Sequence, residues 1–300
     1  MFTGLSAFPL TPFVDDAVDE AAYARLIERL AASGVDSITA LGSTGSYAYL
    51  SQEERARVAQ LAVEHAGATS VHVGVGALRT SHVLQNVRSA ERAGASGVLL
   101  APMTYQALTH DDVFELFAAV ARSTELPVIV YDNPGTTHFE FTPELYGRIA
   151  TLPGVASVKI PALPADADAA AERMARIRAE LPPHVTIGIS GDASAADGLL
   201  AGCDAWYSAI AGTLPEPAIR ITRAARSGDR AGALRASQDL QPLWNLFASM
   251  GGSLRVTATI AELLGLVASP SLPRPILGLS PSQRAEVADV LDRLGALAGR

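Results

Sequence analysis

A single lysine, Lys159, stands within an apolar run of the sequence at residues 155–161, whereas every other basic side chain is an arginine. An ammonium group in such a run loses hydration, which lowers its pKa and makes the neutral amine available as a nucleophile. Lysine is the side chain that forms a Schiff base with a carbonyl compound. Lys159 is therefore the first candidate for covalent catalysis. The alternative is a structural lysine that reaches solvent from the strand end or pairs with a carboxylate.

A tyrosine, Tyr131, ends a second apolar run at residues 128–131 and precedes Asp132-Asn133-Pro134-Gly135. A phenol held at the end of a strand can accept and return a proton, as a general acid–base catalyst does. The same position also suits a tyrosine that closes the core with its hydroxyl in water. Tyr131 is a candidate whose role depends on what lies beside it.

A turn rich in glycine and hydroxyl groups, Gly42-Ser43-Thr44-Gly45-Ser46, follows a third apolar run. Its glycines let the backbone bend tightly and expose amides to an anion, with two hydroxyls alongside. This pattern fits a substrate carboxylate. It also fits an ordinary strand-to-helix connection, because glycine and serine are common in such turns.

Other chemical classes find little support in the sequence. The six histidines lack the spacing of metal ligands, so a metal-dependent aldolase is disfavoured. Gly74-Val75-Gly76 lacks the third glycine and the ribose-binding acid of a dinucleotide site. We expect chemistry that needs no metal and no cofactor.

The elements that must position these residues alternate between strands and helices. Strands are predicted at residues 5–8, 37–41, 71–74, 97–100, 128–131, 155–159, 186–190 and 205–208. Between them, apolar residues at three- and four-residue spacing predict amphipathic helices. Continuously apolar strands in such an alternation indicate a parallel sheet covered on both faces. Eight units predict a closed (β/α)₈ TIM barrel, whose chemistry lies at the carboxyl ends of its strands.

Further helices are predicted after the barrel, at residues 229–250, 254–264 and 282–297. We expect a C-terminal helical bundle packed on the barrel, with the barrel spanning residues 1–225 and the extension residues 226–300. No linker or low-complexity tract separates the two parts, so an independent second domain is not expected.

Composition narrows the partners and the location. The net charge of −8 is spread without a basic tract, which disfavours nucleic acid and anionic membranes as partners. No apolar run is long enough to span a membrane, and no signal peptide is evident, so a soluble, cytoplasmic protein is expected. The lone Cys203 cannot form an internal disulfide and is expected to be a buried small residue.

Together, these residues resemble the dihydrodipicolinate synthase and N-acetylneuraminate lyase family of class I aldolases along essentially the whole chain. The matching motifs appear in family order: Gly4-Leu5, Thr11-Pro12-Phe13, Gly42-Ser43-Thr44-Gly45, Tyr131, Lys159, Ser190-Gly191-Asp192 and Gly202.

The resemblance implies a reaction on a 2-oxo acid such as pyruvate. Its carboxylate would lie against Ser43 and Thr44 while Lys159 forms the imine. Tyr131, assisted by Ser43, would move protons, and the enamine would attack an aldehyde or be released by carbon–carbon cleavage. The family also implies a homo-oligomer, a dimer or tetramer, in which a tyrosine from a neighbouring subunit completes the relay. Tyr105 is the nearest match for that tyrosine.

Departures from the family pattern bear on the substrate. Ser46 replaces the family's usual glutamate and Asp132 its usual asparagine. Thr136 stands where synthases of this family generally carry an arginine that binds the aldehyde's carboxylate. This predicts poor use of aspartate semialdehyde and better use of hydroxylated substrates, which Thr136, Thr137 and Ser208 could bind. A dehydratase of a sugar-derived 2-oxo acid, dihydrodipicolinate synthase proper and a non-catalytic binding relative remain the alternatives.

Overall fold

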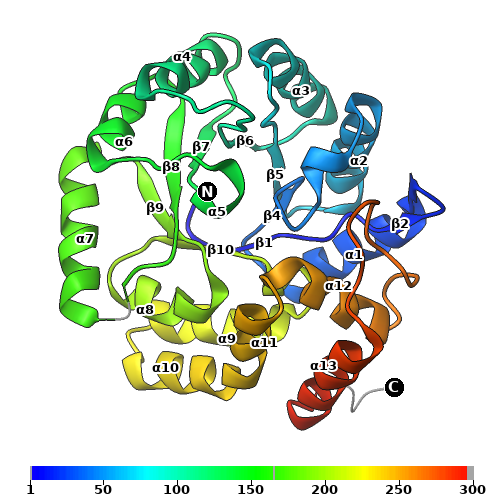
Figure 1. The fold of residues 1–300 in the computed structure, drawn as a ribbon. Helices are drawn as coiled ribbons and strands as arrows, with labels where there is room; N and C mark the ends of the chain where they lie inside the picture. The colour runs from blue at the N-terminus through cyan, green and yellow to red at the C-terminus, as the bar shows by residue number, and fades with distance from the viewer. Residues whose placement is uncertain (1, 165, 296–300) are drawn as a thin grey trace.

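The chain forms a closed barrel of eight parallel strands in a computed structural model that describes residues 2–164 and 166–295 (Figure 1). Each strand pairs with its neighbours in chain order, and the ring closes between the first and the last. The strands are β1 Gly4–Ala7, β4 Ser37–Ala40, β5 Ser70–Gly74, β6 Gly97–Leu100, β7 Val128–Tyr131, β8 Val155–Ile160, β9 Thr186–Ile189 and β10 Ala205–Ser208. The predicted TIM barrel and all eight of its strands are confirmed. A separate hairpin, β2 Phe13–Val14 and β3 Ala17–Val18, follows the first strand.

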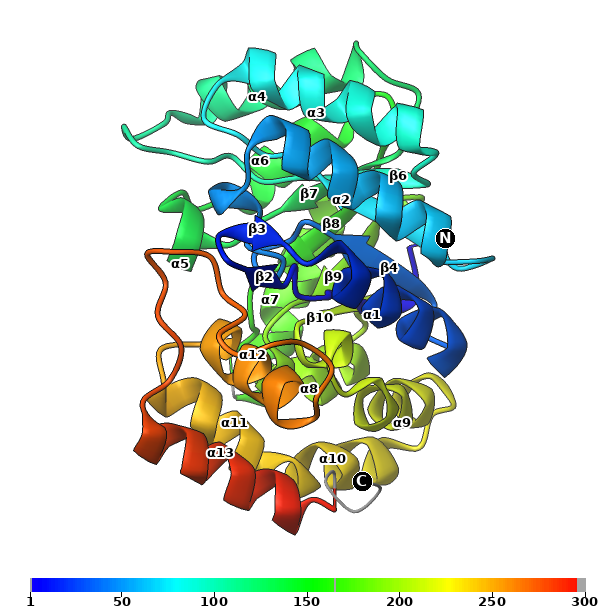
Figure 2. The same ribbon diagram turned by 90° about the vertical axis from the view of Figure 1, so that its right-hand side faces the viewer.

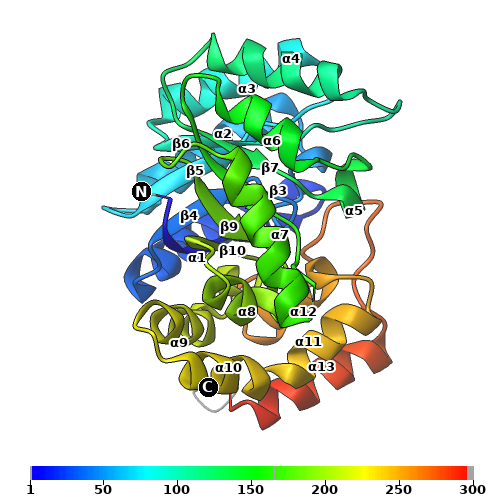
Figure 3. The same ribbon diagram turned by 90° about the vertical axis from the view of Figure 1, so that its left-hand side faces the viewer.

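Helices that follow the barrel strands form a ring around the barrel (Figure 1). They are α1 Glu20–Ser33, α2 Gln52–His65, α3 Thr80–Ala93, α4 His110–Ala121, α6 Pro143–Ala150, α7 Ala167–Glu180, α8 Ala195–Leu200 and α9 Pro215–Arg226. Capping boxes begin α2 at Ser51 and α4 at Thr109, which satisfies amides that the helix itself leaves unpaired. The short helix α5, Pro134–Thr137, lies over the middle of the barrel, and the N-terminus lies at the opposite end (Figures 2 and 3).

The C-terminal helices pack beside the barrel as α10 Arg230–Asp239, α11 Gln241–Ser249, α12 Ser253–Leu263 and α13 Pro281–Arg293 (Figure 2). The prediction of one continuous helix over residues 229–250 was wrong. The helix ends at Asp239 and a new one begins at Gln241, because Pro242 in its first turn has no amide to continue the earlier hydrogen bonds. The predicted end of the last helix, residue 297, lies outside the described residues. The proposed division at 225/226 falls at the end of α9 and stays a prediction.

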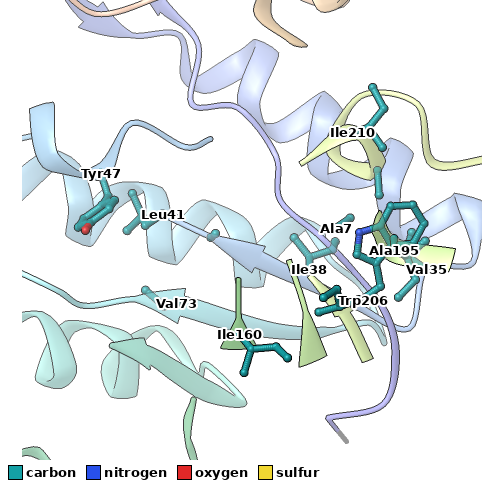
Figure 4. Close-up of a cluster of buried hydrophobic side chains, with 14 of the residues drawn as sticks. Ala7, Val35, Ile38, Leu41, Tyr47, Val73, Ile160, Ala195, Trp206 and Ile210 are labelled. Atoms are coloured by element: carbon teal, nitrogen blue, oxygen red, sulfur yellow. The ribbon is translucent and has the colours of Figure 1, made fainter. Parts of the chain in front are cut away.

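Two apolar layers result from the alternation of side chains along each strand. The larger cluster lies between the strands and the helices, and Figure 4 labels Ile38, Ile160 and Trp206 among its members. The smaller cluster fills the barrel and includes Phe8, Tyr131 and Tyr207. Neighbouring residues of one strand therefore face different surroundings, and this decides which of them reach the barrel interior.

A buried histidine, His72, is one of the polar groups in the barrel. Its Nδ1 lies 3.5 Å from the Thr39 hydroxyl, and its ring stacks on Phe2 with centroids 4.9 Å apart. Its Nε2 has no hydrogen-bond partner among the residues that the structure describes. Burial lowers the pKa of His72 from 6.5 to about 4, so the imidazole is neutral near pH 7.

Candidate active site

Lys159 points into the barrel from β8 and is only 4% exposed. Its Nζ lies 4.0 Å from the centre of the Tyr131 ring and 5.5 Å from that of Phe8, so two aromatic faces replace much of its water. Burial lowers the pKa of Lys159 from 10.5 to about 7, although the carboxylates of Asp192 and Asp132 favour its charged form. Near neutral pH, a large share of this amine is neutral and nucleophilic.

Tyr131 ends the neighbouring strand β7 and is paired in register with Lys159. Its phenol oxygen lies 3.1 Å from the Ser43 hydroxyl, and the Asn133 side-chain amide donates to it at 2.8 Å. Burial raises the pKa of Tyr131, while the bonds from Ser43 and Asn133 oppose the rise. The phenol therefore has defined partners beside the amine, which is the geometry that proton transfer needs. Asn133 was not singled out from the sequence.

The turn that carries Ser43 follows β4 through a bend at Leu41, whose φ of 57° lies in the left-handed region. A bulky residue pays about 1–2 kcal/mol for this conformation, so the surroundings must enforce it. Two glycines allow it. A Cβ at Gly74 would lie 1.9 Å from the Leu41 carbonyl oxygen, and one at Gly42 would lie 2.4 Å from the Phe8 ring. The bend brings Ser43 and the buried Thr44 to the cavity wall.

Asp192 is buried, lines the same cavity as Lys159 and is held by three donors. The Ile210 amide donates to it at 2.8 Å, the Ser208 hydroxyl at 2.9 Å and the Trp206 indole at 3.1 Å. Ser208 is fully buried, accepts a hydrogen bond from the Ala211 amide, and does not line the cavity. Ser208 is therefore not among the predicted site residues that the structure brings together at the cavity, and its role in binding a substrate hydroxyl stays a prediction. Ser208 shares the outer face of β10 with Trp206, whereas Tyr207 faces the barrel.

Asp132 lies on the outer side of its strand, behind Tyr131, and is buried. The Tyr146 hydroxyl donates to one carboxylate oxygen at 2.5 Å. Burial raises the pKa of Asp132 to about 6, and the charges of Arg173 and Lys159 oppose that rise. This residue acts on the site through its charge, since it does not line the cavity.

A cavity of about 960 Å³ opens above Lys159 at the carboxyl ends of the strands. Ser43, Thr44, Tyr131 and Lys159 all line it, so the structure brings these predicted site residues together. Thr136 of α5 lies at its rim with an exposed side chain, whereas Thr137 is buried and does not line it.

The rim also contains residues of the C-terminal helices. Trp244 and Phe247 come from α11, and Arg255 comes from α12. The Arg255 Nε donates to the Leu277 carbonyl at 2.9 Å, and its guanidinium forms no ion pair with the described residues. Arg79 lies at the start of α3 and does not line the cavity.

Tyr105 does not reach the cavity of its own chain. Its side chain is 87% exposed, in the loop between β6 and α4. Two other loop aromatics do line the cavity: Tyr47 is buried and Tyr49 is half exposed. Tyr47 also stacks under the Arg55 guanidinium, 5.3 Å from its ring centre, which makes it a packing residue as well as a wall residue.

In residues 2–164 and 166–295, no group of three or more histidine, cysteine or acidic residues could hold a metal ion. Over the same part of the chain, no helix is long and apolar enough to cross a membrane.

The sequence matches the family model described as the dihydrodipicolinate synthetase family over residues 1–294. It is similar to the 4-hydroxy-tetrahydrodipicolinate synthase of Methylococcus capsulatus, with 31% identity over 292 residues and 97% of each chain covered. The crystal structure of dihydrodipicolinate synthase from Agrobacterium tumefaciens is 45% identical, covers 98% of each chain and has a TM-score of 0.93. A synthase from Acinetobacter baumannii, solved in complex with pyruvate, shares the fold with a TM-score of 0.88 at 23% identity, over 98% of this chain and 99% of that one.

A closed barrel with a buried lysine facing a tyrosine at its strand ends is the architecture of a Schiff-base-forming lyase, a class I aldolase. The chain belongs to the dihydrodipicolinate synthetase family.

Proposed function

We propose that Lys159 forms a Schiff base with a 2-oxo acid such as pyruvate, and that the enzyme makes or cleaves a carbon–carbon bond beside the former ketone without a cofactor. The observation that carries the proposal is the buried Lys159 amine in the wall of a cavity, 4.0 Å from the centre of the Tyr131 ring. The pyruvate complex of the Acinetobacter baumannii protein supports the choice of pyruvate as the first substrate to test.

Each step has a group within reach. The substrate carboxylate lies against the turn of Ser43 and Thr44, whose hydroxyls and amides can donate to it. The Lys159 amine adds to the carbonyl carbon, and the former carbonyl oxygen leaves as water, which yields a protonated imine. Loss of a proton from the neighbouring carbon gives an enamine. Tyr131 and Ser43 carry the protons between substrate, imine and water.

The enamine then attacks an aldehyde, and hydrolysis of the new imine releases the product and restores Lys159. Cleavage is the same sequence in reverse. A hydroxylated aldehyde fits the rim, because the Thr136 hydroxyl offers one neutral hydrogen bond where an arginine would offer two charge-assisted ones. Ser43 and Thr44 on one wall and Thr136 on the rim are the proposed binding residues.

A second candidate is dehydration of a sugar-derived 2-oxo acid. There the same enamine expels the hydroxyl group from the adjacent carbon, and this group takes up a proton and departs as water. A cavity of about 960 Å³ with Thr136 at its rim favours it, since a longer hydroxylated chain has room beyond the imine. Analysis of the products separates the two candidates. An aldolase joins pyruvate to a hydroxyaldehyde, whereas a dehydratase removes water from a 3-deoxy-2-oxo sugar acid.

A homo-oligomer and an intracellular location complete the proposal. Tyr105 is exposed on its own subunit, so a neighbouring copy is the partner whose cavity it could complete. Sedimentation of the wild type, with kinetics of Tyr105→Phe, tests this. An assembled enzyme whose turnover is unchanged by the substitution contradicts the role for Tyr105.

The decisive experiment for the Schiff base is reductive trapping. The protein is incubated with pyruvate and borohydride, digested, and examined by mass spectrometry. We expect one adduct on Lys159, and none in Lys159→Arg. An adduct confined to the amino terminus, or none with any 2-oxo acid tested, overturns the proposal.

A further inference from the structure

We infer that Asn133 is a positioning residue that holds the Tyr131–Ser43 pair in the arrangement needed to pass a proton, and stabilises the phenolate when Tyr131 has given its proton away. The inference deepens the proposed function, and rests on it for the reaction itself. It begins with three contacts. The Asn133 Nδ2 lies 2.8 Å from the Tyr131 phenol oxygen and 3.3 Å from the Ser43 hydroxyl oxygen, and those two oxygens are 3.1 Å apart.

The amide nitrogen can only donate hydrogen bonds, so both oxygens must accept from it. Between the two hydroxyls, one then donates to the other. When Tyr131 is protonated and donates to Ser43, the Ser43 proton is free to point into the cavity. When Tyr131 has lost its proton, its oxygen accepts from both Ser43 and Asn133. The amide therefore favours the direction of transfer from Tyr131 through Ser43 toward substrate.

The backbone around Asn133 is fixed independently of its side chain. Asn133 stands two residues after Tyr131, so both side chains leave the extended segment on the same side. The Asn133 carbonyl accepts from the Thr136 amide, the Thr137 amide and the Thr137 hydroxyl at 2.9–3.0 Å. Pro134, the first residue of α5, disfavours the helical region for Asn133, whose φ is −147° and whose ψ is 71°. Replacing the side chain leaves these anchors in place.

Asn133 also lacks the capping hydrogen bond that an asparagine side chain usually makes at the start of a helix. It is the N-cap residue of α5, yet its side chain makes no capping hydrogen bond. The side chain instead donates hydrogen bonds to Tyr131 and Ser43, so its polar group is used in the site and not in capping the helix.

The test uses two variants of similar shape and a matched control. Asn133→Leu removes the donor, and Asn133→Asp replaces it with an acceptor. Asn245→Asp makes the same change on the exposed face of α11, where Asn245 accepts a hydrogen bond from the Gln241 side chain at 2.9 Å. The first measurement is deuterium exchange at the methyl group of pyruvate in heavy water, followed by NMR across pH, because exchange reports proton transfer after imine formation.

We expect exchange to slow by about 10- to 100-fold in Asn133→Leu, the loss of one hydrogen bond to a charged oxygen, and more in Asn133→Asp. Trapping on Lys159 should persist in both, and the pH dependence of exchange should move to higher pH. The Asn245 variant should match the wild type. Unchanged exchange, or a parallel loss of exchange and trapping with no shift in the pH profile, contradicts the inference, since the latter is what a merely structural role produces.

A second measurement does not depend on any substrate. Fluorotyrosine-labelled protein is titrated by ¹⁹F NMR, and the Tyr131 signal is assigned by its absence in Tyr131→Phe. The Tyr131 phenol should ionise at higher pH in Asn133→Leu than in the wild type. An unshifted titration refutes the inference even where trapping succeeds. Failed trapping with a shifted titration refutes the proposed function and leaves the role of Asn133 standing.

Discussion

The pH dependence of imine formation tests the central feature of the site, the neutral amine of Lys159. Burial holds its pKa at about 7, against 10.5 for an ordinary lysine. At pH 7, about half of the amine is then neutral, compared with about 0.03% of an exposed lysine, a difference of about 10³-fold in nucleophile concentration. The rate of trapping by borohydride at low pyruvate should rise with pH, reach half its maximum near pH 7 and level off above about pH 8.

A charge-removing variant checks the sign of the electrostatics. The Asp132 carboxylate favours the ammonium form, so Asp132→Asn should lower the Lys159 pKa and move the half-maximal rate to lower pH. Asparagine keeps the side chain's size and an oxygen that can accept from Tyr146. The assay measures adduct on the Lys159 peptide at short times, at fixed pyruvate and borohydride, with the thermal midpoint of each variant as a control for folding.

A trapping rate that continues to rise beyond pH 9 would refute the reasoning, because it would mean that Lys159 titrates as an ordinary lysine. A midpoint that moves upward in a folded Asp132→Asn variant would show that the carboxylate acts by another route than its charge.

Three further outcomes are expected. Tyr131→Phe should slow turnover by about 10²- to 10⁴-fold with smaller loss of 2-oxo acid binding, measured by steady-state kinetics on an identified substrate; near wild-type turnover would make Tyr131 a packing residue. In a coupled assay of pyruvate plus aspartate semialdehyde, the wild type should turn over slowly and Thr136→Arg faster. Efficient turnover by the wild type that is lost in Arg255→Leu would instead show that Arg255 binds the carboxylate of the aldehyde. The pKa of His72 in the folded protein is lowered from 6.5 to about 4, so the stability that the neutral imidazole contributes is lost as pH falls through that window. In urea unfolding, the wild type should lose about 3 kcal/mol more than His72→Asn over this range. An equal dependence of the unfolding free energy on pH in the two proteins would contradict this.

The strands could be predicted because each is an uninterrupted apolar run between polar turns, and the barrel follows from their number and order. The same uniformity hides which residues face inward. In the run from Ala205 to Ser208, nothing in the sequence distinguishes Tyr207, which faces the barrel, from Ser208, which faces the helices. That choice is made by barrel closure, where eight strands fix one another's rotation, so the sequence did not show that Ser208 contacts Asp192 and lies away from the cavity lining.

The composition of the chain points to Lys159, because burying an ammonium group in an apolar run costs free energy that packing alone does not return. Asn133 carries a signal that was available but weak. A residue two positions after a candidate tyrosine, and kept out of the helical region by the following proline, shares that tyrosine's side of the chain. The break between α10 and α11 likewise had a local cause in Pro242, which the apolar periodicity across residues 229–250 obscured.

In the proposed reaction, the covalent chemistry and the choice of substrate come from different parts of the molecule. Lys159, Tyr131 and the Ser43 turn belong to strands and strand ends, whose positions depend on the closed barrel. The rim is supplied by Thr136 of α5 and by α11 and α12, which the chain adds after the barrel is complete. Substitutions at Thr136 or Arg255 can therefore change which second substrate is accepted while imine formation at Lys159 continues. In the proposed reaction, the identity of the aldehyde or sugar acid depends on these rim residues, among them Thr136, where the sequence departs from the family pattern.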